Sequence, residues 1–163
     1  MPAGQPDSLY ERLCIAREDL ELTIRLGEHI LRQRLYRSRL GNLTAGAFAT
    51  TLILAYARTF TPNLDRNGRP DQKVNNLLRA QLSADDLRFT EKVIQRRNEG
   101  VAHSDARAFD LVVFETGPVV QMHSVLFGPP TEDETKRMLS IARNCLDVVM
   151  GEIRHLNPRR ERD

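Results

Sequence analysis

The stretch TEDETKRMLSIARNCLDVVMGEIRHL, residues 131–156, gives the clearest indication of the fold. It follows a Gly-Pro-Pro run, and Thr131 with Glu134 three residues later forms the capping-box pattern that opens a helix. Apolar residues then recur at steps of three and four, which places them on one side of a helix. They are Met138, Leu139, Ala142, Cys145, Leu146, Val149, Ile153 and Leu156. The stretch therefore predicts a long amphipathic helix.

A second long amphipathic pattern starts near the beginning of the chain. Ser8 and Glu11 form another capping box, and the apolar face that follows is sustained to about Leu40. Its members recur at the same helical steps and are Leu9, Leu13, Ala16, Leu20, Ile24, Gly27, Leu31 and Leu35. Because Gly and Asn commonly end helices, we expect this one to stop at Gly41 and Asn42.

The middle of the chain predicts three shorter helices. The first runs from about Thr44 to Phe60, and the turn-rich residues 61–70 after it predict a surface loop. A short helix is expected to start at residue 71. The third is capped by Ser83 and weakened or ended by Gly100.

The pattern changes after residue 110. Two apolar runs, 111–114 and 119–127, flank the turn Thr116-Gly-Pro118 and predict a two-stranded hairpin. The predicted fold is mainly α: an antiparallel helical bundle with this small β-hairpin between the fourth helix and the last one. At 163 residues the chain is long enough for one domain. We assign residues 8–157 to it, and residues 1–7 and 158–163 to flexible ends.

The composition is that of a soluble globular protein, with 40% hydrophobic, 28% charged and 6% aromatic residues. The net charge of +2 is too small to indicate a nucleic-acid binder. However, 21 of the 24 basic residues are Arg, whose planar side chain suits bidentate contacts to phosphate. A genomic composition bias would produce the same preference.

The sequence favours a cytoplasmic protein without a membrane segment. Cys14 and Cys145 lie far apart, which fits a reducing compartment. Residues 1–7 lack the apolar core of a signal peptide, and the longest apolar run, 52–57, is too short to cross a bilayer.

One short stretch concentrates groups that can act on a phosphodiester. The sequence RRNEGVAHSD, residues 96–105, contains two guanidiniums, an amide, an imidazole and two carboxylates. Arg can hold a phosphate through paired N–H donors, and His can move a proton near neutral pH. The other three His residues are isolated from one another in sequence. No phosphate loop, metal-ligand pattern or Gly-x-Ser-x-Gly motif is present, so neither a metal nor another cofactor is expected.

This stretch resembles the signature of the HEPN superfamily. That signature is an Arg, a polar residue directly after it, and a His four to six residues beyond the Arg. Arg97, Asn98 and His103 match it here. The surrounding VAHSD and the apolar helix before the motif resemble the branch related to abortive-infection proteins. The resemblance covers roughly residues 44–105 and implies an all-α fold.

The resemblance also implies a function. Many prokaryotic members are RNases of toxin–antitoxin and phage-defence systems, and they cleave RNA without a metal. His103 would transfer the proton, Arg97 would stabilise the transition state, and Asn98 would orient the phosphate or the imidazole. The supporting residues would be Arg96, Glu99, Ser104 and Asp105. The cleft is usually shared across a homodimer, and the partner would be an antitoxin or a nucleotidyltransferase.

Two features of the sequence keep other interpretations open. In a strict helix, residues six apart lie about 120° out of line, so Gly100 must relax the backbone to bring Arg97 and His103 together. Without that break, Glu99 could pair with Arg96 or His103 on a solvated helix face. A basic cluster also lies at the end of the first predicted helix, where it suits either RNA phosphates or the helix dipole. It consists of Arg32, Arg34, Arg37 and Arg39.

Three hypotheses therefore remain. In the first, the chain is a HEPN-type RNase. In the second, it is a non-catalytic HEPN-like domain that binds RNA, a nucleotide or a protein partner. The third is an unrelated helical scaffold in which the motif occurs by chance.

Overall fold

The computed structural model describes residues 8–38, 42–64, 70–100, 109–110, 123–124 and 129–156. Its helices are α1 (Ser8–Arg32), the short 3-10 turn η1 (Leu35–Arg37), α2 (Leu43–Thr59), α3 (Lys73–Arg79), α4 (Ala84–Gly100) and α5 (Glu132–Leu156). Two pairs of two-residue strands are also present: β1 (Asn63–Leu64) with β2 (Pro70–Asp71), and β3 (Phe109–Asp110) with β4 (His123–Ser124).

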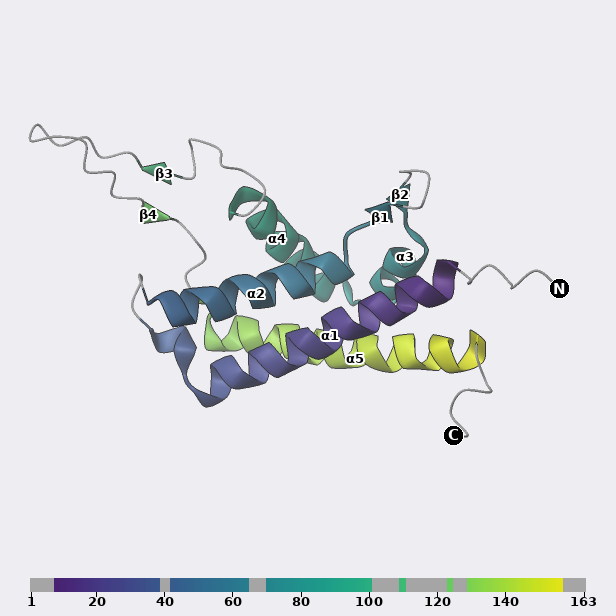
Figure 1. The fold of residues 1–163 in the computed structure, drawn as a ribbon, viewed down its shortest axis with the longest axis horizontal. Coiled ribbons are helices and arrows are strands. Elements are labelled where there is room, and N and C mark those ends of the chain that lie inside the picture. The colour runs from purple at the N-terminus through teal and green to yellow at the C-terminus, as the bar shows by residue number, and fades with distance from the viewer. Residues whose placement is uncertain are drawn as a thin grey trace, which may run out of the picture.

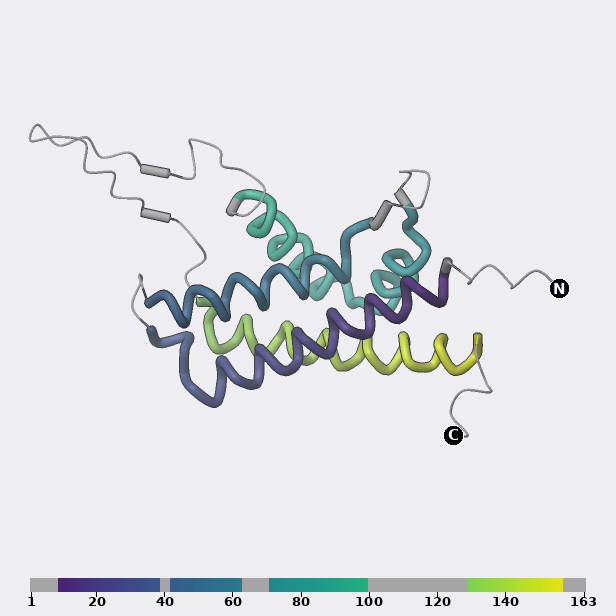
Figure 2. The backbone as a smooth tube through the Cα atoms, in the orientation of Figure 1, coloured from purple at the N-terminus to yellow at the C-terminus, as the bar shows by residue number. Residues whose placement is uncertain are grey.

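The two longest helices, α1 and α5, run antiparallel along the length of the molecule (Figure 1). Helix α2 turns back along α1, α4 packs on α2, and α3 contacts α1. The start of α1 and the end of α5 lie at the same end of the bundle (Figure 2). The predicted helical bundle is confirmed.

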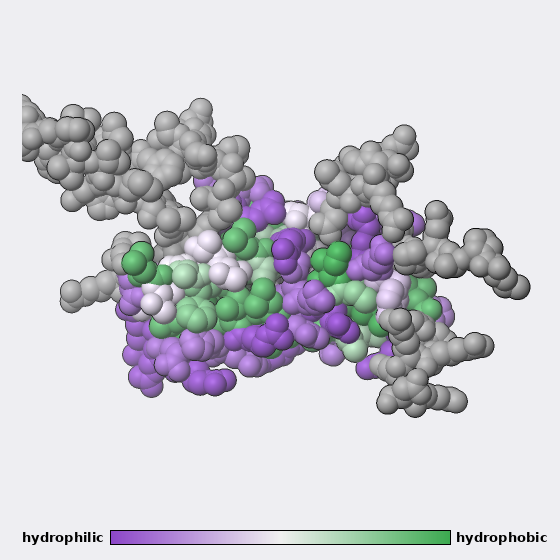
Figure 3. All heavy atoms as spheres, viewed as in Figure 1, coloured by the Kyte–Doolittle hydropathy of each residue, from purple (hydrophilic) through white to green (hydrophobic). Residues whose placement is uncertain are grey.

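The buried core draws most of its residues from α1, α2 and α5, with smaller contributions from α3 and α4. Its largest fully buried side chains include Tyr56, Phe60, Leu20 and Met138. Leu20 and Met138 lie on the apolar faces predicted from sequence, which is why the apolar spacing identified the two long helices. In the space-filling view, apolar and weakly polar atoms also run along α2, above strongly hydrophilic atoms of the C-terminal half of α1 (Figure 3).

Gly27 allows α1 and α5 to approach closely. A Cβ atom at this position would lie 2.8 Å from Cδ2 and 2.9 Å from Cγ of Leu139. Non-bonded carbon atoms essentially never come this close, so a larger residue at position 27 would force Leu139 or one of the helices to move.

The predicted helix starts are confirmed at α4 and α5. In α5 the Thr131 hydroxyl accepts from the Glu134 amide at 3.1 Å, and the Glu134 carboxylate accepts from the Thr131 amide at 2.8 Å. At α4 the Ser83 hydroxyl accepts from the Asp86 amide at 3.1 Å. Each cap satisfies N–H groups that have no partner within the helix.

The predicted end of the first helix is wrong. Helix α1 stops at Arg32 rather than near Leu40, because Arg34 adopts the left-handed backbone conformation with φ of 53°. The 3-10 turn follows, and Leu35 still packs against the core. Asn42 does not end α1 but caps α2, where its side chain accepts from the Ala45 amide at 3.0 Å.

The region predicted as a surface loop contains the β1–β2 pair. Asn63 pairs with Asp71 and Leu64 with Pro70, while residues 65–69 lie outside the described part of the chain. Farther on, Phe109 pairs with Ser124 and Asp110 with His123. Residues 111–122 and 125–128 are not among those described, so the hairpin expected there stays a prediction. The same holds for the expected ends, 1–7 and 158–163.

A buried polar contact fixes α4 against α2. The hydroxyls of Tyr56 and Thr90 lie 2.8 Å apart, and both side chains are fully buried. Burial raises the pKa of Tyr56, so this phenol stays protonated and can donate the hydrogen bond. The ring of Phe89 meets that of Tyr56 edge-on, with centroids 6.4 Å apart.

Tyr56→Phe should lower the free energy of unfolding by about 1–2 kcal/mol, because it leaves the buried Thr90 hydroxyl without its partner. Tyr56→Phe combined with Thr90→Val should recover most of that loss, since both polar groups are then gone. Urea denaturation of the single and double variants measures the difference. Additive losses in the double variant would show that the two hydroxyls are not coupled.

Candidate functional site

The C-terminal turn of α4 carries the first part of the predicted motif. Arg97 lies in this last turn, where a cation is favoured by the helix dipole. Its Nε and Nη2 groups both donate to Oδ1 of Asn98, at 3.0 and 2.7 Å. The amide of Asn98 therefore orients the guanidinium and leaves three of its five N–H groups outside this contact.

Arg96 and Glu99, the neighbouring supporting residues, have other partners. Nη1 of Arg96 lies 3.9 Å from Oε2 of Glu134, the carboxylate that also caps α5. Glu99 accepts a hydrogen bond from Gln95 at 2.7 Å. The contact to Glu134 links the end of α4 to the first turn of α5.

Helix α4 extends to Gly100, and the rest of the motif follows it. His103, Ser104 and Asp105 lie outside the described residues. The structure thus brings Arg97 and Asn98 into contact, with Arg96 beside them. Whether His103 joins them stays a prediction.

The second predicted cluster lies close to the same end of α5. Arg32 is in the last turn of α1, as expected for a cation at a helix C-terminus, whereas Arg34 and Arg37 lie beyond the helix end. All three are exposed, and Arg39 is not among the described residues. The guanidinium of Arg37 stacks 5.6 Å from the centre of the Tyr36 ring.

The first turn of α5 lies between the two arginine groups. Hydrogen bonds from Lys136 and from Tyr36 lower the pKa of Glu132, so one side of this turn contacts η1, the 3-10 turn that follows α1. Glu134 contacts Arg96 on the other side. The spacing of residues in the sequence could not predict that the two arginine groups lie on either side of this turn. They are about 60 residues apart, and it is α5 that lies between them.

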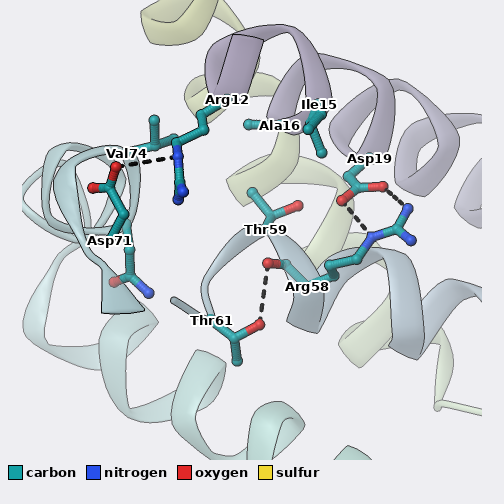
Figure 4. Close-up of a pocket in the computed structure, with 10 residues that line it drawn as sticks. Arg12, Ile15, Ala16, Asp19, Arg58, Thr59, Thr61, Asp71 and Val74 are labelled. Atoms are coloured by element: carbon teal, nitrogen blue, oxygen red, sulfur yellow. Dashed lines mark hydrogen bonds and ion pairs between the residues drawn. The ribbon is translucent and has the colours of Figure 1, made fainter. Parts of the chain in front are cut away.

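A polar cluster between α1, α2 and α3 was missed by the sequence analysis (Figure 4). Buried Asp19 accepts from both Nε and Nη2 of Arg58, with 2.6 Å between Nε and Oδ2. Nearby, Nε of Arg12 lies 3.1 Å from Asp71. These groups line a small pocket of about 10 Å³, which has room for about one water molecule.

The charges of this polar cluster are matched in pairs, so they connect α1 to α2 and to strand β2 rather than offering a reactive group. Asp19 could have been found from sequence, because it interrupts the apolar face between Ala16 and Leu20. Its partner Arg58 could not, because nothing in the sequence pairs residues 39 apart.

Other chemistries have little support among the described residues. They contain no group of three or more His, Cys, Asp or Glu side chains that could hold a metal ion. Burial raises the pKa of Cys145 to about 12, which keeps its thiol protonated and unreactive. None of the described helices is both long enough and apolar enough to span a membrane.

Comparisons with known proteins found no matching family model, no matching curated protein and no matching solved structure.

The start of α4 is fixed by a charged contact to α5. Nε and Nη2 of Arg137 each lie 2.9 Å from Oδ1 of Asp86, and the same guanidinium lies 5.0 Å from the centre of the Phe89 ring. The Ser83 hydroxyl and, after it, Arg137 lower the pKa of Asp86 against the opposing effect of partial burial. A carboxyl with a lowered pKa stabilises the fold above its unfolded pKa, and this contribution is lost as pH falls through the folded pKa.

Asp86→Asn should therefore lower the free energy of unfolding at pH 7 by about 0.5–1 kcal/mol, a solvent-screened value. At a pH well below 4 the difference from the parent protein should disappear, since Asp86 is then protonated. Urea denaturation at both pH values measures this. Asp85→Asn is the control, because Asp85 is in the same turn but pairs only with exposed Arg88. An equal effect of both variants would assign the loss to the helix dipole.

Proposed function

We propose that this chain is a metal-independent endoribonuclease of HEPN type, and that it acts as a toxin or a phage-defence component. The observation that supports this most directly is the contact between Arg97 and Asn98 at the end of α4. The two residues that the resemblance assigns to phosphate binding and orientation touch each other, and three N–H groups of the guanidinium lie outside this contact.

In the proposed reaction, a ribose 2′-OH attacks the adjacent phosphorus atom, and the bond from phosphorus to the 5′-oxygen breaks. His103 accepts the 2′-OH proton as a base or supplies the proton that the leaving 5′-oxygen gains. Arg97 stabilises the extra negative charge on the phosphorane-like transition state. The products are a 2′,3′-cyclic phosphate and a free 5′-OH.

The surroundings favour an anionic substrate. Arg96 lies beside Arg97, and Arg32, Arg34 and Arg37 lie on the other side of the first turn of α5. Exposed or half-buried cations in two groups near one end of a bundle can contact several phosphates of one strand. The proposal includes the predicted hairpin after α4, a cytoplasmic location and restraint by an antitoxin or a nucleotidyltransferase.

We further propose that the chain acts as a homodimer through α2. No charged residue occurs in α2 before Arg58, although part of the helix faces solvent. Leu43 is 89% exposed, Ala47 and Thr51 are exposed, and Leu54 is only half-buried. An uncharged helix face of this length is unusual at a surface and would fit a second copy of the same chain. Because α4 packs on α2, such a dimer would form next to the helix that carries Arg97.

The alternative is a HEPN-like domain that binds RNA, a nucleotide or a protein without cleaving it. The contact between Arg97 and Asn98 serves binding equally well. The two proposals differ in whether His103 transfers a proton, and cleavage assays separate them.

Purified protein, separated from any partner, should cleave RNA in the presence of EDTA and leave 2′,3′-cyclic phosphate ends. His103→Ala should reduce the rate at least about 100-fold, because a positioned proton donor or acceptor contributes that much. Arg97→Lys should reduce it by a similar factor, since a point charge cannot replace a bidentate contact. Gel analysis of a labelled RNA measures both rates.

His155→Ala and Arg88→Lys are matched controls, because both residues are exposed and lie on α5 and α4 away from the motif. They should cleave at the parent rate. Absence of cleavage at every pH between about 6 and 8, where His titrates, would favour the binding domain instead. Loss of cleavage in EDTA would refute the metal-independent mechanism.

The protein should have twice its monomer mass of 18.6 kDa in solution. Ala47→Glu should dissociate it, because burying an unpaired charge in an interface costs several kcal/mol. Ala84→Glu, also at an exposed alanine of a helix, should leave the dimer intact. Light scattering of the three proteins gives the result. A parent protein that is monomeric at all concentrations would refute the dimer.

A further inference from the structure

A second concave surface lies between α1 and α5, apart from the end of α4. This groove has a volume of about 480 Å³ and is formed by the last turns of α1 and the first half of α5. Its charged lining residues are Glu28, Arg32, Lys136 and Arg143. The predicted basic cluster contributes only Arg32 to it, so most of the groove was not anticipated from sequence.

The groove carries more positive than negative charge. Three cations line it against one carboxylate, and that carboxylate is already paired: Oε1 of Glu28 lies 2.8 Å from Nη2 of Arg143. Lys136 pairs with Glu132, which is not among the lining residues, at 2.6 Å. Arg32 forms no ion pair with any residue in the described part of the chain. An anion entering the groove would therefore meet at least one guanidinium that needs no rearrangement.

The remaining lining combines an apolar floor with hydrogen-bond donors. Leu31 and Leu139 contribute apolar surface, and Leu139 is the residue that Gly27 approaches closely. Ser140 and Asn144 lie on the exposed side of α5. Apolar surface can carry a base or ribose, while cations and neutral donors can hold the phosphate between them.

The shape favours a segment of a chain over a small molecule. Pockets for small ligands bury most of the ligand surface and are mainly apolar. This groove is open to solvent, and charged or polar side chains contribute six of its eight lining residues. Single-stranded nucleic acids bind in open cationic grooves of this kind, which follow the phosphate backbone.

We propose that the groove between α1 and α5 binds the phosphodiester backbone of single-stranded RNA, away from the site of cleavage. Arg32, Lys136 and Arg143 contact the phosphates. Nine residues of α5, about 14 Å along its axis, separate Glu134 beside Arg96 from Arg143, so a strand of several nucleotides could contact both regions. The inference names the path of the substrate and so rests on the proposed function, but binding can be measured without cleavage.

The test uses full-length protein carrying His103→Ala, so that the strand stays intact, and a fluorescein-labelled 12-nucleotide single-stranded RNA of mixed sequence. Arg32→Gln combined with Lys136→Gln should weaken binding at least tenfold in about 0.1 M salt. The slope of log Kd against log salt should fall by about 1.4, because each lost phosphate contact on a single strand contributes about 0.7. The control, Lys73→Gln combined with Arg88→Gln, removes the same charge from exposed positions outside the groove. Its effects on the affinity and on the salt slope should each be less than half of those of the groove variant.

A gain of affinity gives the sharper result. Glu28→Gln removes the only carboxylate among the described lining residues and frees Arg143 from its ion pair, so it should tighten binding about threefold or more. Glu21→Gln is the matched control, since Glu21 lies seven residues earlier on α1 and pairs with Arg17 and Arg25 at 3.7 Å. The control should have little effect.

Equal effects of Glu28→Gln and Glu21→Gln would overturn the proposal, because general electrostatics would then explain both. So would unchanged affinity in the Arg32 and Lys136 variant, even if the parent protein cleaves RNA. If the parent does not cleave RNA but the groove variants change affinity as described, the groove is supported and the nuclease is not.

Discussion

The close contact between α1 and α5 at Gly27 is the constraint on which the rest of the arrangement depends. With only a hydrogen atom at Gly27, Leu139 can pack directly against the backbone of α1. This contact fixes how the two longest helices lie along each other, and hence where the first turn of α5 meets the end of α1. The groove is formed beside the same contact, with Leu139 in its lining. This packing also places Arg32 and Lys136 along the same groove.

Helix α4 is held mainly at its start and middle, while the motif lies at its end. Asp86 contacts Arg137, and Thr90 bonds to Tyr56, within the first seven residues of the helix. Toward the other end, Arg96 meets Glu134 at 3.9 Å, a long and partly exposed ion pair that adds little stability. The contacts at its start and middle thus position the helix, and the ion pair of Arg96 with Glu134 adds little to this. A binding group benefits from such a positioned helix, because less conformational freedom is lost on binding.

The sequence predicted those parts of the fold that depend on local chemistry. The caps at Ser83 and Thr131 were correct because the groups that form them lie three residues apart. The end of α1 was not predicted, because Leu35 continues the apolar spacing while Arg34 leaves the helical conformation. A left-handed backbone conformation is expected at Gly or Asn, so the Arg at position 34 did not indicate that the helix ends there. For the site, the local pair of Arg97 and Asn98 could be anticipated, whereas the contact from Arg96 to Glu134 depends on tertiary packing.

The acidic first turn of α5 explains how two cationic groups coexist at one end of the bundle. Glu132 and Glu134 contact Lys136 and Arg96, respectively, and carboxylates at a helix N-terminus are themselves favoured by the helix dipole. The carboxylates therefore reduce repulsion between the cations without being buried. A phosphate that binds Arg96 or Lys136 must compete with them, which lowers the net gain from each contact. Under the proposed function this competition limits how tightly RNA and its cleaved products are held, and so favours release over retention.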